Sequence, residues 1–234
     1  MTTPLVLLPG LLCDGALWAP IIDALADVAH CHVADLARDD GVRAMAHRVL
    51  DEAPWPEFAL AGFSMGGYVA FEVMRQAPGR ITRLALLDTG AGPDSPERAE
   101  ERRRGISLAR SDKGFTTIAH LLLSSMLHPD RADDPVLGAV LRTMAERVGR
   151  EGYVRQQTAI LGRPDSRPSL VDIRCPTLVL CGRDDRRAPL AWHEEMAAGI
   201  PGAVLEVIED SGHMVTLEQP AATAAALRRW LGPG

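Results

Sequence analysis

The stretch Gly62-Phe63-Ser64-Met65-Gly66 constrains the fold of this chain more than any other. A short apolar run at 58–61 precedes it, and apolar residues at helical spacing follow it up to residue 77. A serine between a strand and a helix requires a very tight turn, in which side chains two positions on either side would collide. Glycine at positions 62 and 66 removes that collision. The sequence therefore predicts a sharp strand-turn-helix with Ser64 at its tip.

A serine in this position is typical of a nucleophile elbow, the turn that exposes a reactive hydroxyl at the edge of a sheet. The helix that follows presents free backbone N–H groups and the positive end of its dipole to the serine oxygen. The alternative interpretation is a glycine-rich turn with an incidental serine. The five-residue pattern alone does not decide between the two, so the rest of the chain has to.

Apolar, strand-like runs and amphipathic, helix-like segments alternate along most of the chain. This alternation is typical of a parallel sheet covered on both faces, and it predicts an α/β fold with a mostly parallel sheet of about six strands. The expected strands lie at 5–8, 31–36, 58–61, 81–87, 176–181 and 204–208. The expected flanking helices lie at 18–28, 42–50, 68–77, 189–200 and 220–231.

The alternation breaks between residues 91 and 168, where four helix-like segments appear at about 95–110, 113–127, 134–148 and 151–161. We expect a helical insertion there, over a core made of residues 1–90 and 169–234, within one structural domain overall. The second segment is too apolar for a lone surface helix and has to lie against the core. The charge run from Glu97 to Arg104 is interpreted as a solvated helix face with an i,i+4 pair between Glu100 and Arg104.

Composition argues against several classes of function. The 234 residues carry a net charge of −6 and no basic stripe, so no nucleic-acid partner is expected. No apolar run is long enough to span a bilayer, and the first ten residues are interpreted as a strand and not as a signal peptide. The four cysteines form no C-x-x-C pair, which favours a reducing cytoplasm. His30 and His32 have no third ligand nearby, so no metal site is expected.

Polar residues follow three of the expected strands: Ser64, Asp185 and His213. The carboxyl ends of parallel strands lie along one edge of a sheet, so these side chains are expected to meet there. A histidine can take the proton of a serine hydroxyl and later deliver it to a leaving group, while a carboxylate holds the imidazole in the required tautomer. The backbone N–H groups of Leu11 and Met65 are expected to stabilise the developing oxyanion.

Four segments of the chain carry a resemblance to a known family. They are LVLLPG, GFSMGG, PTLVLCGRDDRRAP and VIEDSGHMVTLEQP. Together with the order serine, aspartate, histidine, they resemble the α/β-hydrolase superfamily along nearly the whole chain, in particular its compact esterases and enol-lactonases. The resemblance implies that the acid lies three residues after Gly182, at Asp185, and that residues 91–168 correspond to the family's cap. The loop after the first strand departs from the family, because it reads Pro9-Gly10 where His-Gly is common, and the usual N-terminal β-hairpin is missing.

Two other aspartates compete with Asp185 for the role of the acid. Asp184 can instead cap the next helix or pair with an arginine. Asp88 follows the fourth expected strand, a position that some members of the superfamily use, but the complete G-x-x-D loop favours Asp185. The segment from Arg163 to Pro168, which returns the chain to the core, is interpreted as a solvated hinge, with a substrate carboxylate as the alternative partner of its arginines.

The chain is therefore expected to be a serine hydrolase that cleaves a small carboxylic ester, lactone or thioester through an acyl-enzyme on Ser64, without a cofactor or metal. The aliphatic insertion predicts an apolar pocket. Its expected lining consists of Leu12, Phe63, Leu122 and Met126. The same catalytic residues support C–C bond hydrolysis and perhydrolysis, and a ligand receptor with slow or no turnover is the alternative class.

Overall fold

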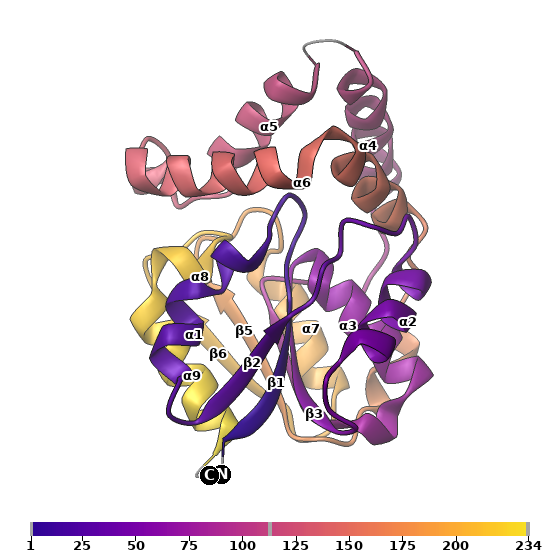
Figure 1. Cartoon of the computed structure of the whole chain (residues 1–234), viewed down its shortest axis with the longest axis vertical. Coiled ribbons are helices and arrows are strands. Elements are labelled where there is room, and N and C mark those ends of the chain that lie inside the picture. The colour runs from indigo at the N-terminus through magenta and orange to yellow at the C-terminus, as the bar shows by residue number, and fades with distance from the viewer. Residues whose placement is uncertain (1, 112–113, 233–234) are drawn as a thin grey trace.

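The computed structural model describes residues 2–111 and 114–232, without the side chains at positions 120, 121, 123 and 124. The described residues form one sheet of six parallel strands in the order β2-β1-β3-β4-β5-β6 (Figure 1). The strands are β1 (Thr3–Leu8), β2 (Ala29–Val33), β3 (Phe58–Phe63), β4 (Ile81–Leu87), β5 (Thr177–Gly182) and β6 (Val204–Ile208). The predicted α/β fold with about six strands is confirmed.

The second strand begins and ends earlier than predicted, at residues 29–33 in place of 31–36. It is an edge strand, so β1 is its only partner and sets its length. Leu7 pairs with Val33, and the N–H of Ala34 still donates to the carbonyl of Leu7 at 3.0 Å. Because β1 ends at Leu8, the following residues have no strand to pair with.

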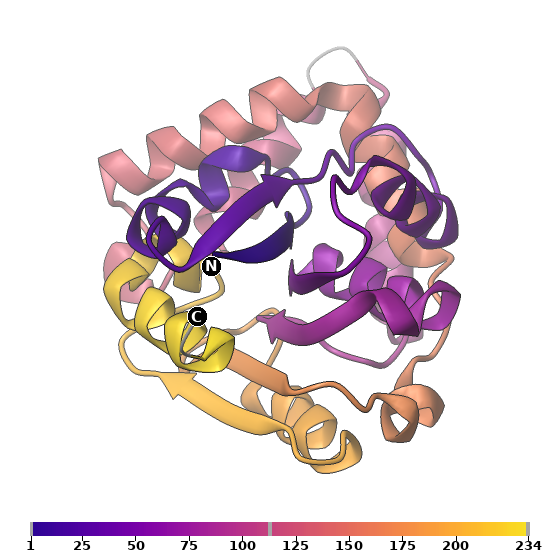
Figure 2. The ribbon, with the colours of Figure 1, turned by 60° about the horizontal axis from the view of Figure 1, so that its bottom comes forward.

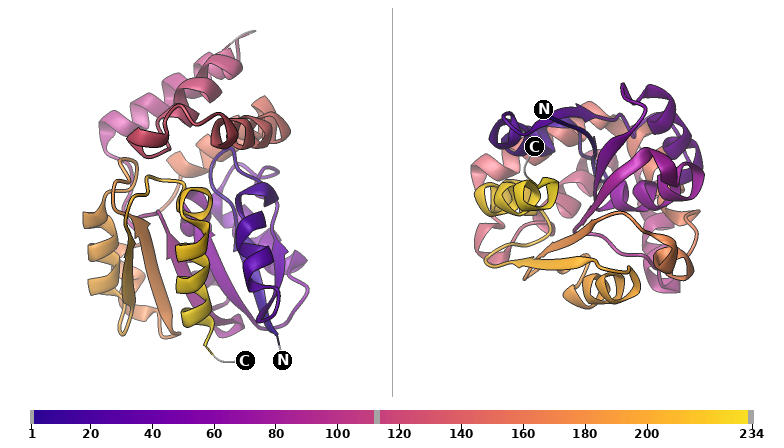
Figure 3. Two further views of the ribbon diagram at one scale, coloured as in Figure 1. Left: turned by 90° about the vertical axis from the view of Figure 1, so that its left-hand side faces the viewer. Right: turned by 90° about the horizontal axis from the view of Figure 1, so that it is seen from below.

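Helices cover both faces of the sheet. On one face α1 (Ala19–Leu25) packs against α9 (Pro220–Leu231), and on the other lie α2 (Val42–Glu52), α3 (Met65–Gln76) and α7 (Leu190–Gly199), as Figures 1 and 3 show. Figure 2 shows the twisted sheet between these layers. Every residue of β3 and of β5 is buried, which explains why both strands read as continuous apolar runs. Shorter elements are α8 (Val215–Glu218) and the 3₁₀ turns Gly15–Leu17, Pro78–Arg80, Pro129–Arg131 and Arg167–Asp172.

Three helices between β4 and β5 lie over the carboxyl edge of the sheet and contact one another (Figure 1). They are α4 (Pro96–Ala109), α5 (Gly114–Ser124) and α6 (Pro135–Leu161). The last two predicted segments are joined in α6. The helical geometry nevertheless breaks at Gly149, which is where the boundary between them was expected, and its φ of 70° suits glycine. Residue 113, the expected start of the second segment, lies outside the described residues. Among the described helices, none has the length and apolarity needed to cross a membrane.

The strand order reverses between β1 and β3, because the chain passes from β1 to β2 on one side and later returns to β3 on the other. Open parallel sheets bind ligands in the crevice at this point. The loop after β1 and the turn after β3 approach each other closely here. A Cβ atom on Gly10 would lie 2.9 Å from the ring of Phe63 and 3.3 Å from the Cβ of Ser64. Glycine at position 10 thus brings the first loop against the serine.

Candidate active site

Ser64 occupies a strained turn between β3 and α3. Its φ of 52° and ψ of −114° lie outside the regions that L-residues prefer, at a cost of about 1–3 kcal/mol. Glycines on either side make the turn possible, because a Cβ on Gly62 would lie 2.5 Å from the carbonyl oxygen of Gly66, and one on Gly66 would overlap the carbonyl of Leu8. The hydroxyl of Thr89 holds the turn by donating to the carbonyl of Ser64 at 2.8 Å.

The structure brings Ser64, His213 and Asp185 together in one hydrogen-bonded chain. The Nε2 atom of His213 lies 2.9 Å from the Oγ of Ser64, and its Nδ1 atom lies 2.8 Å from the Oδ2 of Asp185. The other carboxylate oxygen of Asp185 accepts hydrogen bonds from the N–H groups of Arg187 (2.7 Å) and Ala188 (3.0 Å). Burial favours the neutral acid, but the adjacent imidazole and these N–H donors outweigh it, so the pKa of Asp185 is lowered and the side chain is ionised.

Sequence reasoning missed Glu218, which fixes the loop that carries His213. Its fully buried Oε1 accepts hydrogen bonds from the N–H groups of Gly212 (3.0 Å) and Met214 (3.1 Å), on either side of the histidine. Its Oε2 accepts from the N–H of His128 at 2.7 Å, which ties the same loop to the segment before α6. The signal available in the sequence was an acidic residue, Glu218, five positions after His213 and ahead of the last helix.

The two expected oxyanion donors lie beside the serine. Leu11 and Met65 line the same cavity as Ser64, and among the described residues no protein acceptor takes the N–H of either one. The neighbouring N–H of Leu12 donates to the Oε1 of Gln156 at 3.0 Å. Gln156 lies on α6, so a helix above the sheet holds the loop after β1. This loop has Pro9-Gly10 in place of His-Gly, and no histidine is present to hold it.

Asp88 and Asp184 do not reach His213. Asp88 is fully buried and its Oδ1 accepts a hydrogen bond from the N–H of Gly182 at 2.9 Å, while its Oδ2 has no partner among the described residues. Burial, and then the nearby charge of Asp185, raise the pKa of Asp88 well above its usual value, which favours the neutral form of this side chain. Asp184 lies instead 3.4 Å from the Nε2 of His128. Of the three aspartates that the sequence proposed, Asp185 alone contacts the imidazole.

A narrow cavity of about 20 Å³ adjoins Ser64 and His213, and a wider cleft of about 490 Å³ lies next to it. Of the residues expected in the pocket, Met126 lines the narrow cavity and Leu122 lines the wider cleft. Leu12 and Phe63, which were also expected in the lining, border neither space. The ring of Phe63 packs instead against the imidazole of His213, at 5.2 Å between centroids.

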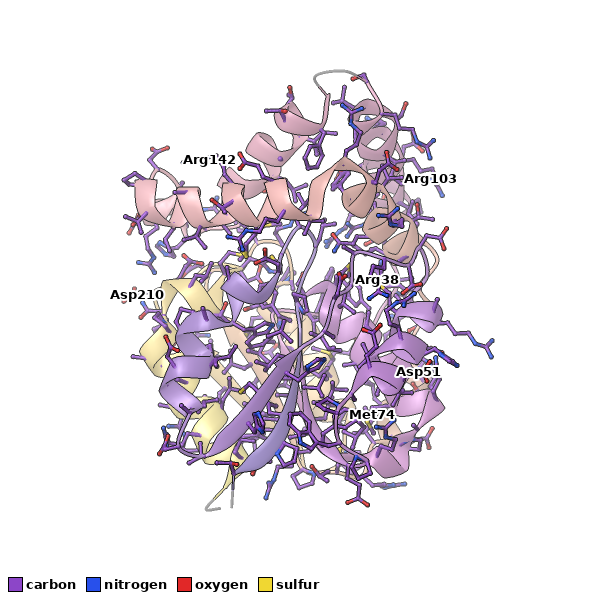
Figure 4. The ribbon with its side chains drawn as sticks, viewed as in Figure 1. Arg38, Asp51, Met74, Arg103, Arg142 and Asp210 are labelled. Atoms are coloured by element: carbon purple, nitrogen blue, oxygen red, sulfur yellow. The ribbon has the colours of Figure 1, made fainter. Side chains whose placement is uncertain are left out.

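The predicted apolar pocket is apolar only in part, because Arg98, Arg102 and Arg187 line both the cavity and the cleft. The interpretation of the charge run as a solvated face fails for Arg98 and Arg102, whose side chains are 30% and 10% exposed. It holds for Arg103, which is 61% exposed and points away from the sheet (Figure 4), and for Arg104, which pairs with Glu100 at 3.6 Å. Helical periodicity in the sequence distinguishes the face of α4 that carries Arg98 and Arg102 from the exposed face, but it does not show that the first face lies against the site.

The expected solvated hinge is also wrong for Arg163. Its side chain is 4% exposed and donates hydrogen bonds to the carbonyl of Gly92 and to Asp94, while its guanidinium lies 4.3 Å from the ring centroid of Tyr68. Arg167 in the same segment is 48% exposed and pairs with Asp165. No group of three or more His, Cys, Asp or Glu side chains suited to a metal occurs in the described ranges.

His193 is a second buried imidazole close to the site. Its Nε2 accepts a hydrogen bond from the N–H of Thr89 at 3.0 Å, so the proton is on Nδ1, which lies 3.3 Å from the carbonyl oxygen of Pro189. Complete burial lowers the pKa of His193 to about 4 from an ordinary 6.5, so the ring is neutral in the fold. It holds the chain just after Asp88, at the end of β4.

The protein is expected to become less stable as the pH decreases, because of His193. As the pH decreases from 6.5 to 4, this imidazole is protonated in the unfolded chain but stays neutral in the folded chain. The free energy of unfolding therefore decreases by up to about 3 kcal/mol over that range. The variant His193→Gln keeps an acceptor for Thr89 but cannot titrate, so its stability should change less with pH. Urea unfolding of both proteins at several pH values measures this difference. Parallel curves for the two proteins would contradict it.

Comparison with known proteins places this chain in a family. A model described as the alpha/beta hydrolase family matches residues 5–226. A thermophilic esterase from Thermogutta terrifontis, solved with malate bound, is 31% identical, with 99% of this chain and 90% of that chain covered and a TM-score of 0.89. The enol-lactonase from Burkholderia xenovorans LB400 is 26% identical, with 100% and 92% covered and a TM-score of 0.89.

A relative among the curated proteins also matches this chain over nearly its full length. The pimeloyl-[acyl-carrier protein] methyl ester esterase of Aliivibrio salmonicida is 28% identical, with 98% of this chain and 92% of the relative covered. The family match spans nearly all of the sheet and the helices inserted above it. Sequence, fold and these relatives agree, and the chain belongs to the α/β-hydrolase family.

Proposed function

We propose that this chain is a serine hydrolase that cleaves carboxylic esters or lactones through an acyl-enzyme on Ser64. The observation that carries the proposal is the unbroken chain of hydrogen bonds from Asp185 through His213 to Ser64, at 2.8 and 2.9 Å. The names of the relatives, which include esterases and an enol-lactonase, support an ester or lactone bond as the target.

The geometry supports one set of protonation states before the reaction. Ionised Asp185 is an acceptor, so the Nδ1 atom of His213 carries the proton and the Nε2 atom accepts one from the hydroxyl of Ser64. The imidazole is therefore in the tautomer that a general base needs. Its ring has little freedom to turn away, because it is 4% exposed and packs against Phe63.

The reaction then follows two half-steps. The Oγ atom of Ser64 attacks the ester carbonyl while the Nε2 of His213 takes its proton, and the negative oxygen is stabilised by the N–H groups of Leu11 and Met65. Collapse of this intermediate expels the alcohol, which receives the proton from His213, and leaves an acyl-enzyme. Water activated by His213 then attacks the acyl carbonyl, releases the acid and returns the proton to Ser64.

The helices between residues 91 and 168 are proposed to act as a cap that selects the substrate. Met126, Ile160 and Arg102 from this segment line the cavity at the serine. The carbonyl of Met126 also accepts a hydrogen bond from the N–H of His213 at 2.9 Å, so the cap contacts the catalytic loop directly. The shape and charge of this segment thus decide which esters reach Ser64.

Covalent labelling tests the proposal. A fluorophosphonate probe should modify the folded protein once per chain, and mass spectrometry of the digest should find the label on the peptide that contains Ser64. Labelled protein should lose hydrolysis of p-nitrophenyl butyrate in proportion to the label, and protein unfolded before addition of the probe should remain unlabelled. A folded protein that takes up no label and hydrolyses no ester would favour a ligand receptor instead.

A further inference from the structure

One carboxylate lies within ion-pair distance of three guanidinium groups beside the proposed active site. Asp94 lies 2.6 Å from the Nε of Arg102, 3.0 Å from an amino nitrogen of Arg163 and 3.7 Å from the Nε of Arg98. Its side chain is 4% exposed. Burial disfavours its charge, but the hydrogen bonds from Arg163 and Arg102 prevail and lower the pKa of Asp94 to about 2, so it carries one full negative charge against three positive ones.

Arg187 adds a fourth cation, which forms no ion pair with a carboxylate among the described residues. No Asp or Glu oxygen lies within 4.0 Å of its guanidinium in the described part of the chain, and one amino nitrogen donates to the hydroxyl of Ser125 at 3.2 Å. Burial, and then the charges of Arg102 and Arg98, lower the pKa of Arg187, and the charge of Asp185 opposes them only in part. Positive charge is therefore left uncompensated here, although the whole chain has a net charge of −6.

Three of these arginines lie between the wider cleft and Ser64. Arg98, Arg102 and Arg187 line both the cleft of about 490 Å³ and the narrow cavity at the serine, so a substrate that enters from the cleft passes their side chains. The acids near them compensate this charge only in part, because the carboxylate of Asp185 is bound to His213, the raised pKa of Asp88 favours its neutral form, and Glu101 is exposed. A concave surface with charge of one sign attracts the opposite charge.

We propose that Arg98, Arg102 and Arg187 bind an ionised carboxylate on the substrate, so that the preferred substrates are half esters of dicarboxylic acids, or lactones that carry a free carboxylate. Guanidinium groups suit this ligand because their planar N–H forks match the two oxygens of a carboxylate. The inference rests on the proposed hydrolase function and adds to it the substrate class. It also explains why these charged side chains face the cavity and not the solvent.

A matched pair of substrates tests the inference. The mono-p-nitrophenyl ester of a dicarboxylic acid is compared with the ester in which a primary amide replaces the free carboxylate, for the succinate, glutarate and adipate lengths. We expect kcat/KM of the wild-type protein to favour the charged member by about tenfold or more at one length at least. Raising the ionic strength from about 0.05 M to 0.5 M should reduce this ratio, because salt screens the attraction.

Variants assign the preference to the arginines. Arg187→Gln should lower the ratio of the two kcat/KM values about tenfold, and Arg187→Lys should restore part of it because the charge remains without the fork. Arg98→Gln, at a more exposed position of the cluster, should lower the ratio as well and replaces Arg187→Gln if that variant does not fold. Arg103→Gln on the same helix is the control, since its side chain points away (Figure 4), and it should keep the wild-type ratio.

The outcomes separate this inference from the proposed function. Hydrolysis of both members with a ratio near one at every length, or a ratio that Arg187→Gln and Arg98→Gln leave unchanged, would overturn the carboxylate site and leave the hydrolase intact. Failure of the folded protein to hydrolyse either member, together with failure of the fluorophosphonate to label it, would overturn both.

Discussion

Replacing Ser64 with alanine is expected to lower kcat for p-nitrophenyl esters by about 10⁵–10⁶-fold. The substitution removes the oxygen that lies 2.9 Å from the Nε2 of His213, so no acyl-enzyme can form. The N–H groups of Leu11 and Met65 remain and can still stabilise an oxyanion formed by direct attack of water, which accounts for the residual rate. Steady-state kinetics of the variant and the wild type at equal concentrations of folded protein measure the loss.

The fold should survive this substitution. Alanine differs from serine by one oxygen, and the strained backbone at position 64 is held by hydrogen bonds of the main chain, from the N–H of Ser64 to the carbonyl of Leu87 at 2.9 Å and from the N–H of Gly67 to the carbonyl of residue 64 at 2.9 Å. The midpoint of thermal unfolding is therefore expected to remain close to that of the wild type. Ser107→Ala, at an exposed position of α4, is the control and should retain full kcat. A Ser64→Ala protein that keeps more than a tenth of the wild-type kcat would mean that another group is the nucleophile.

Local signals predicted the frame of the site. The alternation of apolar runs and amphipathic segments predicted the parallel sheet, and a parallel sheet places the ends of β3, β5 and β6 on one edge. Ser64, Asp185 and His213 could therefore be expected to meet although they are far apart in sequence. The steric argument at Gly62 and Gly66 depends only on neighbouring residues, which is why it could be made without a structure.

Contacts between distant segments could not be predicted in this way. Gln156 bonds to the N–H of Leu12 because α6 crosses above the first loop, and neither residue carries a local pattern that points to the other. Arg98 and Arg102 were assigned to solvent because a charged helix face usually meets water. Their burial follows from the position of α4 over the carboxyl edge of the sheet, which is set by packing against α5 and α6.

Replacing Asp185 with asparagine is expected to lower kcat by about 10⁴-fold. The amide keeps the shape of the carboxylate, and its oxygen can still accept from the N–H groups of Arg187 and Ala188. Its NH₂ group then faces the Nδ1 of His213 and can only donate, so the imidazole proton moves to Nε2 and the ring presents a donor to Ser64 where a base is required. Measurement of kcat from pH 6 to 9 shows whether the loss persists at every pH.

Asp88→Asn is the matched control and decides which aspartate is the acid. The raised pKa of Asp88 favours its neutral form, and an asparagine oxygen can replace its Oδ1 as the acceptor for the N–H of Gly182. Exchange of a neutral acid for a neutral amide leaves the tautomer of His213 unchanged, so kcat should stay within about tenfold of the wild type. The reverse pattern, with Asp88→Asn inactive and Asp185→Asn active, would assign the acid to the end of β4. Equal losses in both variants would mean that the two carboxyl groups, which lie close enough for the charge of one to raise the pKa of the other, act on the imidazole together.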